Sequence, residues 1–228
     1  MTGNLTIQTP KAVGEAIARL ESAGYQAWCV GGCVRDSLLG KLPMDWDITT
    51  SARPEETASC FAGERLIEVG AAHGTIALVT GEGHPVEITT FRQDGTYTDG
   101  RHPDSVGFSR ELEDDLSRRD FTVNAMAWHP ERGLVDLFHG QEDLQAKRLR
   151  CVGDPATRFS EDALRILRCL RFSSQLGFSI DPATAHALWK KRQLLGQLSQ
   201  ERVREELSEL LVGDHGASVL RGYSEEMF

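Results

Sequence analysis

Residues 30–48 read V-G-G-C-V-R-D-S-L-L-G-K-L-P-M-D-W-D-I. Apolar residues, a glycine pair, a helical pattern ended by glycine, and a second apolar alternation follow one another here. The segment therefore predicts a strand, a tight turn, a helix and a second strand, which span 27–30, 31–32, 33–39 and 44–48.

The second predicted strand carries two carboxylates. Successive side chains of a strand point to opposite faces, so Asp45 and Asp47 share one face while Trp46 and Ile48 take the other, toward a core. Two carboxylates so placed are rigid oxygen ligands of the kind that Mg2+ prefers. The alternative is an ordinary solvated D-x-D strand end.

The glycine turn is a candidate phosphate site. Gly31 and Gly32 let backbone N–H groups approach a phosphate, the start of a helix points there, and Arg35 adds a fixed positive charge. A glycine pair alone is usually only a turn. Joined to the D-x-D strand at this spacing, it indicates a phosphate-binding turn beside a metal site.

Composition indicates a globular protein of one large or two small domains. The 228 residues are 40% hydrophobic and 26% charged, with no signal-peptide pattern and no apolar run of membrane-spanning length. The five cysteines are scattered, which favours reduced thiols and a cytoplasmic location over disulfides or zinc.

The net charge of −9 is unusual for a nucleic-acid partner, but its distribution matters more than its sum. Acidic runs at 111–115 and 205–209 carry much of the negative charge, whereas basic residues dominate 147–171. The chain can therefore still offer a basic surface to RNA.

A predicted hairpin supplies a third carboxylate. The strand patterns at 75–80 and 86–91 flank a Gly-Glu-Gly turn. Glu87 lies on a strand that we expect beside the Asp45–Asp47 strand, where it would join the metal site. The alternative is an edge-strand glutamate that faces water.

Residues 118–125 read R-R-D-F-T-V-N-A. Guanidinium groups grip phosphate oxygens, and a neighbouring Asp120 and Asn124 are able to read a ribose 2′-OH, so the motif suits a ribose triphosphate. The alternative is a salt-bridged helix start capped by Asp120.

Residues 158–172 predict one helix capped by Ser160. On such a helix four polar residues would line one side, namely Glu161, Asp162, Arg165 and Arg168, with leucines on another. The alternative is an amphipathic helix with intrahelical ion pairs. Further helices are predicted at 182–194, 200–212 and 217–227.

Three motifs resemble those of the class II tRNA nucleotidyltransferases and bacterial poly(A) polymerases, in the DNA polymerase β-like superfamily. They are V-G-G-x-V-R-D with D-x-D, R-R-D-F-T-x-N-A, and E-D-x-x-R at 161–165, and the likeness extends over about 25–211. It implies an α+β fold: a nucleotidyltransferase head with a mixed β-sheet and flanking helices (1–146), then an all-α neck (147–228). A C-terminal body would be expected to follow.

The resemblance also implies roles for these residues. Asp45 and Asp47 would hold two Mg2+ ions, with Glu87 as a third carboxylate. The triphosphate would be held by Gly31, Gly32, Arg35 and Arg119, and the ribose by Asp120 and Asn124. Asp162 and Arg165 would read C and A, and Arg168 and Arg171 would extend this surface. The stretch 94–103 resembles a family loop that helps the change from C to A addition.

The resulting prediction is template-independent addition of C and A to the tRNA 3′ end from CTP and ATP, with no membrane partner. An A-adding enzyme and a poly(A) polymerase are the alternatives within the family. A non-catalytic fragment that binds nucleotide or RNA is the alternative of another class.

Overall fold

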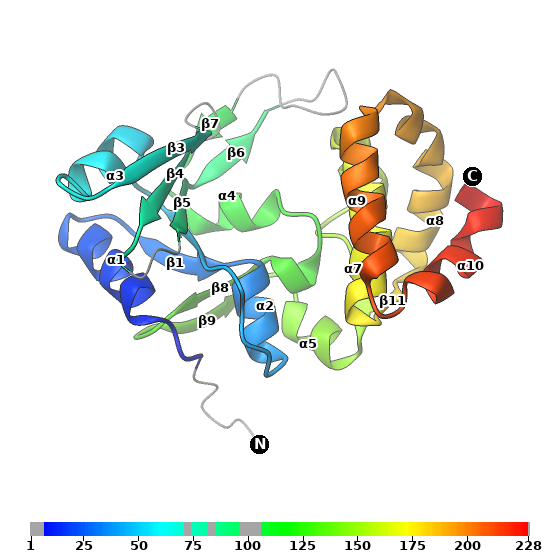
Figure 1. Cartoon of the computed structure of the whole chain (residues 1–228), viewed down its shortest axis with the longest axis horizontal. Helices are drawn as coiled ribbons and strands as arrows, with labels where there is room; N and C mark the ends of the chain where they lie inside the picture. The colour runs from blue at the N-terminus through cyan, green and yellow to red at the C-terminus, as the bar shows by residue number, and fades with distance from the viewer. Residues whose placement is uncertain (1–6, 71–73, 82–84, 96–105, 228) are drawn as a thin grey trace. The chain divides into compact units, whose positions relative to one another are not determined.

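The computed structural model describes residues 7–70, 74–81, 85–95 and 106–227 (Figure 1). The chain divides into two compact units. The first comprises the residues up to Asp94 together with Val106–Arg119 and Asn124–Gly140, and the second comprises Asp120–Val123 and the residues from Gln141 onward. The described helices include none with the length and hydropathy needed to span a bilayer.

The first unit is built on a seven-stranded sheet of order β3-β4-β5-β2-β1-β8-β9. Only the β2–β5 pair in it is parallel among the described strands, and the other pairs are antiparallel. The strands are β1 Ala27–Val30, β2 Asp47–Thr50, β3 Leu66–Gly70, β4 Thr75–Val79, β5 Pro85–Thr90, β8 Met126–His129 and β9 Gly133–Asp136. The mixed sheet and the β4–β5 hairpin confirm the predictions.

Four helices accompany this sheet: α1 Lys11–Ser22, α2 Gly32–Leu38, α3 Pro54–Cys60 and α4 Leu112–Ser117. The α1 helix buries an apolar stripe at helical spacing and contacts β1, β2 and α3. Trp28 and Val30 of β1 pack with Phe91 and with Leu116 of α4. Because Phe91 and Leu116 have no exposed surface, each contributes roughly 1.5–3 kcal/mol through burial.

The strand after the glycine turn starts later than predicted. β2 begins at Asp47, so Asp45 and Trp46 precede it. Gly31 has a φ of 81°, which turns the chain and ends β1 at Val30. The residues before Asp47 therefore have no β1 residue to pair with. On the other side Pro85, at the start of β5, has no N–H to donate.

A strand pair lies on either side of the stretch 94–103 that resembles the family loop. β6 Arg92–Asp94 pairs antiparallel with β7 Val106–Phe108, because the chain continues extended beyond Phe91. Most of the loop that resembles the family's flexible loop, residues 96–103, lies outside the described residues.

The second unit is mainly helical. Its elements are the 3-10 helix η2 Thr122–Asn124, α5 Gly140–Gln145, α6 Pro155–Glu161, α7 Leu164–Leu176, α8 Pro182–Lys191, the 3-10 helix η3 Arg192–Gln197, α9 Gln200–Val212 and α10 Gly216–Met227; the first two cross its boundary with the first unit. A short parallel pair, β10 Arg148–Leu149 and β11 Ser179–Ile180, accompanies them. The α7 helix packs against α9 and α10, and α6 packs against α8.

The single helix predicted over 158–172 is wrong. Asp162 is extended, with φ −138° and ψ 107°, and separates α6 from α7. Its carboxylate accepts a 3.0 Å hydrogen bond from Leu164 N, and this local bond competes with helix continuation. Ser160 lies inside α6 and donates to Ala156 O, so it caps no helix.

Candidate active site

The glycine turn lies beneath two guanidinium groups of the first unit. A Cβ added at Gly31 would meet Arg119 Nη1 at 3.2 Å, and one added at Gly32 would meet Arg35 Nη2 at 3.7 Å. Gly31 also needs its positive φ, which L side chains rarely adopt. Both glycines and both predicted arginines are therefore gathered at one turn.

Arg35 joins two of the predicted motifs. Its Nη1 donates a 2.7 Å hydrogen bond to Asn124 Oδ1, while Nε and Nη2 donate to the Asp36 carboxylate at 2.8 and 3.0 Å. Both Arg35 and Asn124 are buried. Two residues 89 positions apart in the chain thus form one polar cluster.

The three predicted carboxylates lie at one end of the β2–β5 pair. Asp47 is directly opposite Glu87 in the parallel register, as expected from the strand pattern. Glu87 and Asp45 are exposed and Asp47 is partly buried. Since paired residues point to the same face, Asp47 and Glu87 place two negative charges side by side.

The electrostatics of Asp47 fit a cation. Burial, with added repulsion from Glu87 and Asp45, raises the pKa of Asp47 to about 6, while attraction to Arg119 opposes the rise. Within the described ranges, no three histidine, cysteine, aspartate or glutamate side chains gather closely enough to hold a metal ion by themselves. One or two carboxylates completed by substrate phosphates and water are a typical Mg2+ site, and this donor set fits it.

In the second unit, Asp120 forms an ion pair with Arg168. Its Oδ2 accepts from Arg168 Nε at 2.8 Å and Nη2 at 2.7 Å, and its Oδ1 accepts from Phe121 N. Burial raises the pKa of Asp120, but attraction to Arg168 outweighs it and the net shift is downward. Asp120 and Arg168, predicted separately, are thus one ion pair.

Asp162 and Arg165 are each held by a neighbour. Arg165 is buried and its Nη1 donates a 2.6 Å hydrogen bond to Glu161 Oε2, which also pairs with Arg158 at 3.1 Å. Asp162 Oδ2 lies 3.6 Å from Arg202 Nη2 of α9. Because the helix breaks at Asp162, Asp162 and Arg165 do not share the single helical face that the sequence predicted.

Arg171 is paired with a residue that the sequence analysis did not select. Its Nε donates to Glu206 Oε2 at 2.6 Å, and Arg168 Nη1 lies 3.9 Å from Glu206 Oε1. The Arg171 guanidinium also stacks 4.2 Å from the centre of the Phe172 ring. Glu206 lies in an acidic run that looks like a solvated helix face, so its role becomes visible only with the fold.

The sequence analysis also did not select Asp115. It has no exposed surface, and it accepts hydrogen bonds from Arg118 and Arg119. The available signal was its position four residues before Arg119, a spacing that brings side chains together on a helix.

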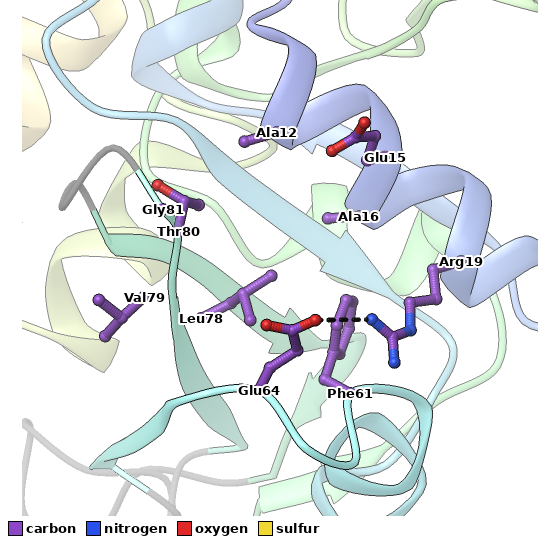
Figure 2. Close-up of a pocket in the computed structure, with 10 residues that line it drawn as sticks. All are labelled: Ala12, Glu15, Ala16, Arg19, Phe61, Glu64, Leu78, Val79, Thr80 and Gly81. Carbon is purple, nitrogen blue, oxygen red and sulfur yellow. Dashed lines mark hydrogen bonds and ion pairs between the residues drawn. The ribbon is translucent and has the colours of Figure 1, made fainter.

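A cavity elsewhere in the first unit contains none of the predicted residues. It has a volume of about 160 Å3 and lies between α1, the turn after α3, and β4 (Figure 2). Arg19 of α1 closes one side through a 3.2 Å ion pair with Glu64, and its guanidinium lies 5.2 Å from the Phe61 ring centre. The predicted carboxylates and glycines do not line it.

Comparisons with known proteins agree with the motifs. Residues 27–150 match the family model of the poly A polymerase head domain, and residues 177–225 match that of the probable RNA and SrmB-binding site of polymerase A. A CCA-adding enzyme of Leuconostoc citreum (strain KM20) is 48% identical over 204 residues, which are 90% of this chain and 50% of the relative.

Solved structures show the same likeness. The CCA-adding enzyme of Bacillus stearothermophilus in complex with CTP is 42% identical with a TM-score of 0.86, over 96% of this chain and 53% of that one. The Thermotoga maritima CCA-adding enzyme complexed with tRNA is 27% identical with a TM-score of 0.79, over 96% and 52%. The chain spans about half the length of the relatives it matches. It belongs to the family of class II CCA-adding enzymes and bacterial poly(A) polymerases.

Proposed function

We propose that the chain carries the nucleotidyltransferase head (1–146) and helical neck (147–228) of an enzyme that adds C and A to the tRNA 3′ end. CTP and ATP would be the donors and pyrophosphate the leaving group. The observation that carries this proposal is the cluster in the first unit. The charge of Arg119 acts on the Asp47 carboxylate, and Arg119 Nη1 lies next to Gly31. Relatives named CCA-adding enzymes support the choice of reaction.

Asp45 and Asp47 would hold Mg2+, with Glu87 as a further carboxylate. Bound Mg2+ would supply Lewis-acid activation of the RNA 3′-OH and charge stabilisation of the leaving pyrophosphate. The fixed β2–β5 register keeps Asp47 and Glu87 aligned without a ligand. Their mutual repulsion favours cation binding, because a cation relieves the cost of two adjacent charges.

The glycine turn and its arginines would bind the triphosphate. Gly31 and Gly32 leave room for phosphate oxygens close to the backbone, which a side chain would occupy. Arg119 and Arg35 would donate charge-assisted hydrogen bonds to those oxygens. Asn124, bonded to Arg35, would hold that guanidinium in place and contact the ribose.

The second unit would select the base. Both C and A carry an exocyclic amine, and Asp162 would accept a hydrogen bond from it. Arg165 would donate a hydrogen bond to a ring nitrogen or a carbonyl oxygen of the base. G and U lack that amine at the same position. Glu161 and Arg202 would position the pair through the contacts at 2.6 and 3.6 Å.

Three more residues of the second unit complete the proposed nucleotide surface. Asp120 would contact the ribose while Arg168 holds its carboxylate in place. Arg168 and Arg171, fixed by Asp120 and Glu206, would extend this surface.

We further infer a cytoplasmic location. All five cysteines are unpaired, and four are buried, where burial raises the pKa of each thiol and keeps it unreactive. Free thiols are the usual state in a reducing compartment.

The test is transfer onto two tRNA acceptors, one ending before the CCA and one ending after CC, with Mg2+ and with CTP, ATP or both. We expect CTP addition to the first acceptor and addition of one A to the second. Addition of A to the CC-ended acceptor alone would indicate an A-adding enzyme, and long A tracts a poly(A) polymerase. Saturable CTP binding without any transfer would favour the non-catalytic alternative.

A further inference from the structure

We propose that the two arginines of the R-R-D-F-T motif have different tasks. Arg118 anchors the buried carboxylate of Asp115, and Asp115 in turn positions Arg119 for the triphosphate. Arg118 and Asp115 are thus positioning residues, and Arg119 is the phosphate ligand. This inference rests on the proposed nucleotidyl transfer.

Asp115 is surrounded by donors on both oxygens. Arg118 donates to Oδ1 through Nε at 3.0 Å and Nη2 at 2.6 Å, in a side-on pair. Arg119 Nη2 donates to Oδ2 at 2.9 Å and Thr49 Oγ1 donates to the same oxygen at 3.2 Å. Arg92 N adds a 3.4 Å contact to Oδ1. The carboxylate is therefore fixed from the turn that follows α4 and from two extended segments.

The two arginines use their donors differently. Arg118 directs Nε and Nη2 to Asp115, which is the geometry of a carboxylate anchor. Arg119 directs only Nη2 there, while its Nη1 stands 3.2 Å from the Cβ position of Gly31. Arg119 is thereby aimed at the turn that would hold phosphate.

Thr49 links the anchor to the carboxylate strand. It lies two residues after Asp47 on β2, so both side chains point to the same face. Because Thr49 and Arg119 donate to one oxygen of Asp115, that oxygen sets Arg119 in register with the Asp47 carboxylate. A displaced Asp115 would misplace Arg119 relative to both the glycine turn and Asp47.

The experiment compares CTP with CMP binding to the full chain in Mg2+, for wild type and for Asp115→Asn, Arg118→Gln and Arg119→Gln. The ratio of the two affinities isolates the triphosphate contacts from base and ribose contacts. We expect Arg119→Gln and Asp115→Asn to lower this ratio by roughly tenfold or more, since each removes a charge-assisted hydrogen bond. Asp114→Asn is the matched control on the same helix. The Asp114 carboxylate accepts from Ser109 Oγ and its backbone carbonyl accepts from Ser117 Oγ, and neither bond involves Arg118 or Arg119.

A double variant separates anchoring from direct binding. If Arg118 acts through Asp115, the pair Asp115→Asn with Arg118→Gln lowers the ratio no further than Asp115→Asn alone. An additional loss of similar size would mean that Arg118 contacts phosphate itself, and would overturn the division of tasks. Thr49→Val is a milder variant, expected to lower the ratio a few-fold if Asp115→Asn fails to fold.

The outcomes also separate this inference from the proposed function. An unchanged ratio in folded Asp115→Asn and Thr49→Val, with normal transfer by wild type, would overturn the positioning role alone. Triphosphate binding that follows the expected pattern without transfer would overturn the proposed activity alone. A wild-type chain that neither distinguishes CTP from CMP nor transfers would overturn both.

Discussion

Asp47 of β2 lies directly opposite Glu87 of β5 in the one parallel pair of the described sheet. Burial raises the pKa of Asp47, and because the parallel register fixes both side chains on one face, repulsion from Glu87 raises it further. A charge arrangement that is unfavourable without a counter-ion is typical of a functional site.

Asp45→Ala should abolish nucleotidyl transfer, with a loss of at least about a hundredfold, because it removes a proposed metal ligand. Asp45 is exposed, so the thermal midpoint should stay within a few degrees of wild type. Glu87→Gln should reduce transfer by roughly tenfold, as expected of a supporting carboxylate. Transfer rates with saturating CTP check both, and substantial transfer by Asp45→Ala would contradict the metal role.

Glu161→Gln should weaken base selection. Without its charge, Glu161 holds the Arg165 guanidinium less firmly, so discrimination between CTP and UTP should fall by roughly tenfold. The measurement is the ratio of kcat/KM values for the two nucleotides. Glu205→Gln on the exposed side of α9 is the control. An unchanged ratio in Glu161→Gln would mean that Arg165 needs no such support.

Asp120→Asn should destabilise the second unit. It removes the negative charge that Arg168 pairs with, and its amide group has only one oxygen to replace the two that accept from Arg168 and from Phe121 N. A fully buried pair would cost about 3–5 kcal/mol, and we expect about 2 kcal/mol because the Arg168 side chain is 34% exposed. Urea unfolding followed by circular dichroism checks the value, and a change below about 0.5 kcal/mol would rule out a structural role for the pair.

Stability should depend on pH through Asp115. Burial raises its pKa, but Arg119 and Arg118 outweigh burial and hold the pKa at about 2, below the ordinary 3.8. The group therefore contributes stability above the unfolded pKa and loses it as the pH falls toward 2. The shift corresponds to about 2 kcal/mol. The difference in unfolding free energy between wild type and Asp115→Asn should shrink between pH 5 and about 2.5; a constant difference would refute the ion-pair assignment.

Local sequence patterns predicted much of the first unit. β1 matches the predicted 27–30, and α2 begins one residue before the predicted start, because glycines and apolar periodicity act over a few residues. The break at Asp162 was not predicted, since no glycine or proline marks it and the cause is a side-chain bond to Leu164 N.

Contacts between residues far apart in the chain explain the remaining differences between the predicted and the observed structure. The motif residues could be selected from the sequence, but not their partners: Glu206 on α9 holds Arg171 across 35 positions, and Thr49 reaches Asp115 across 66. Asp115 itself lies in an acidic run whose composition suggests a solvated surface. Its burial follows only from the packing of α4 on the sheet, which places Leu116 in the core beside it.

The most direct test of the central claim is the mass of the product formed on a tRNA acceptor that ends before the CCA, with Mg2+, CTP and ATP present together. The account predicts an increase of two C residues and one A residue, after which addition stops. An acceptor of unchanged mass, or one extended by a tract of A alone, would contradict it.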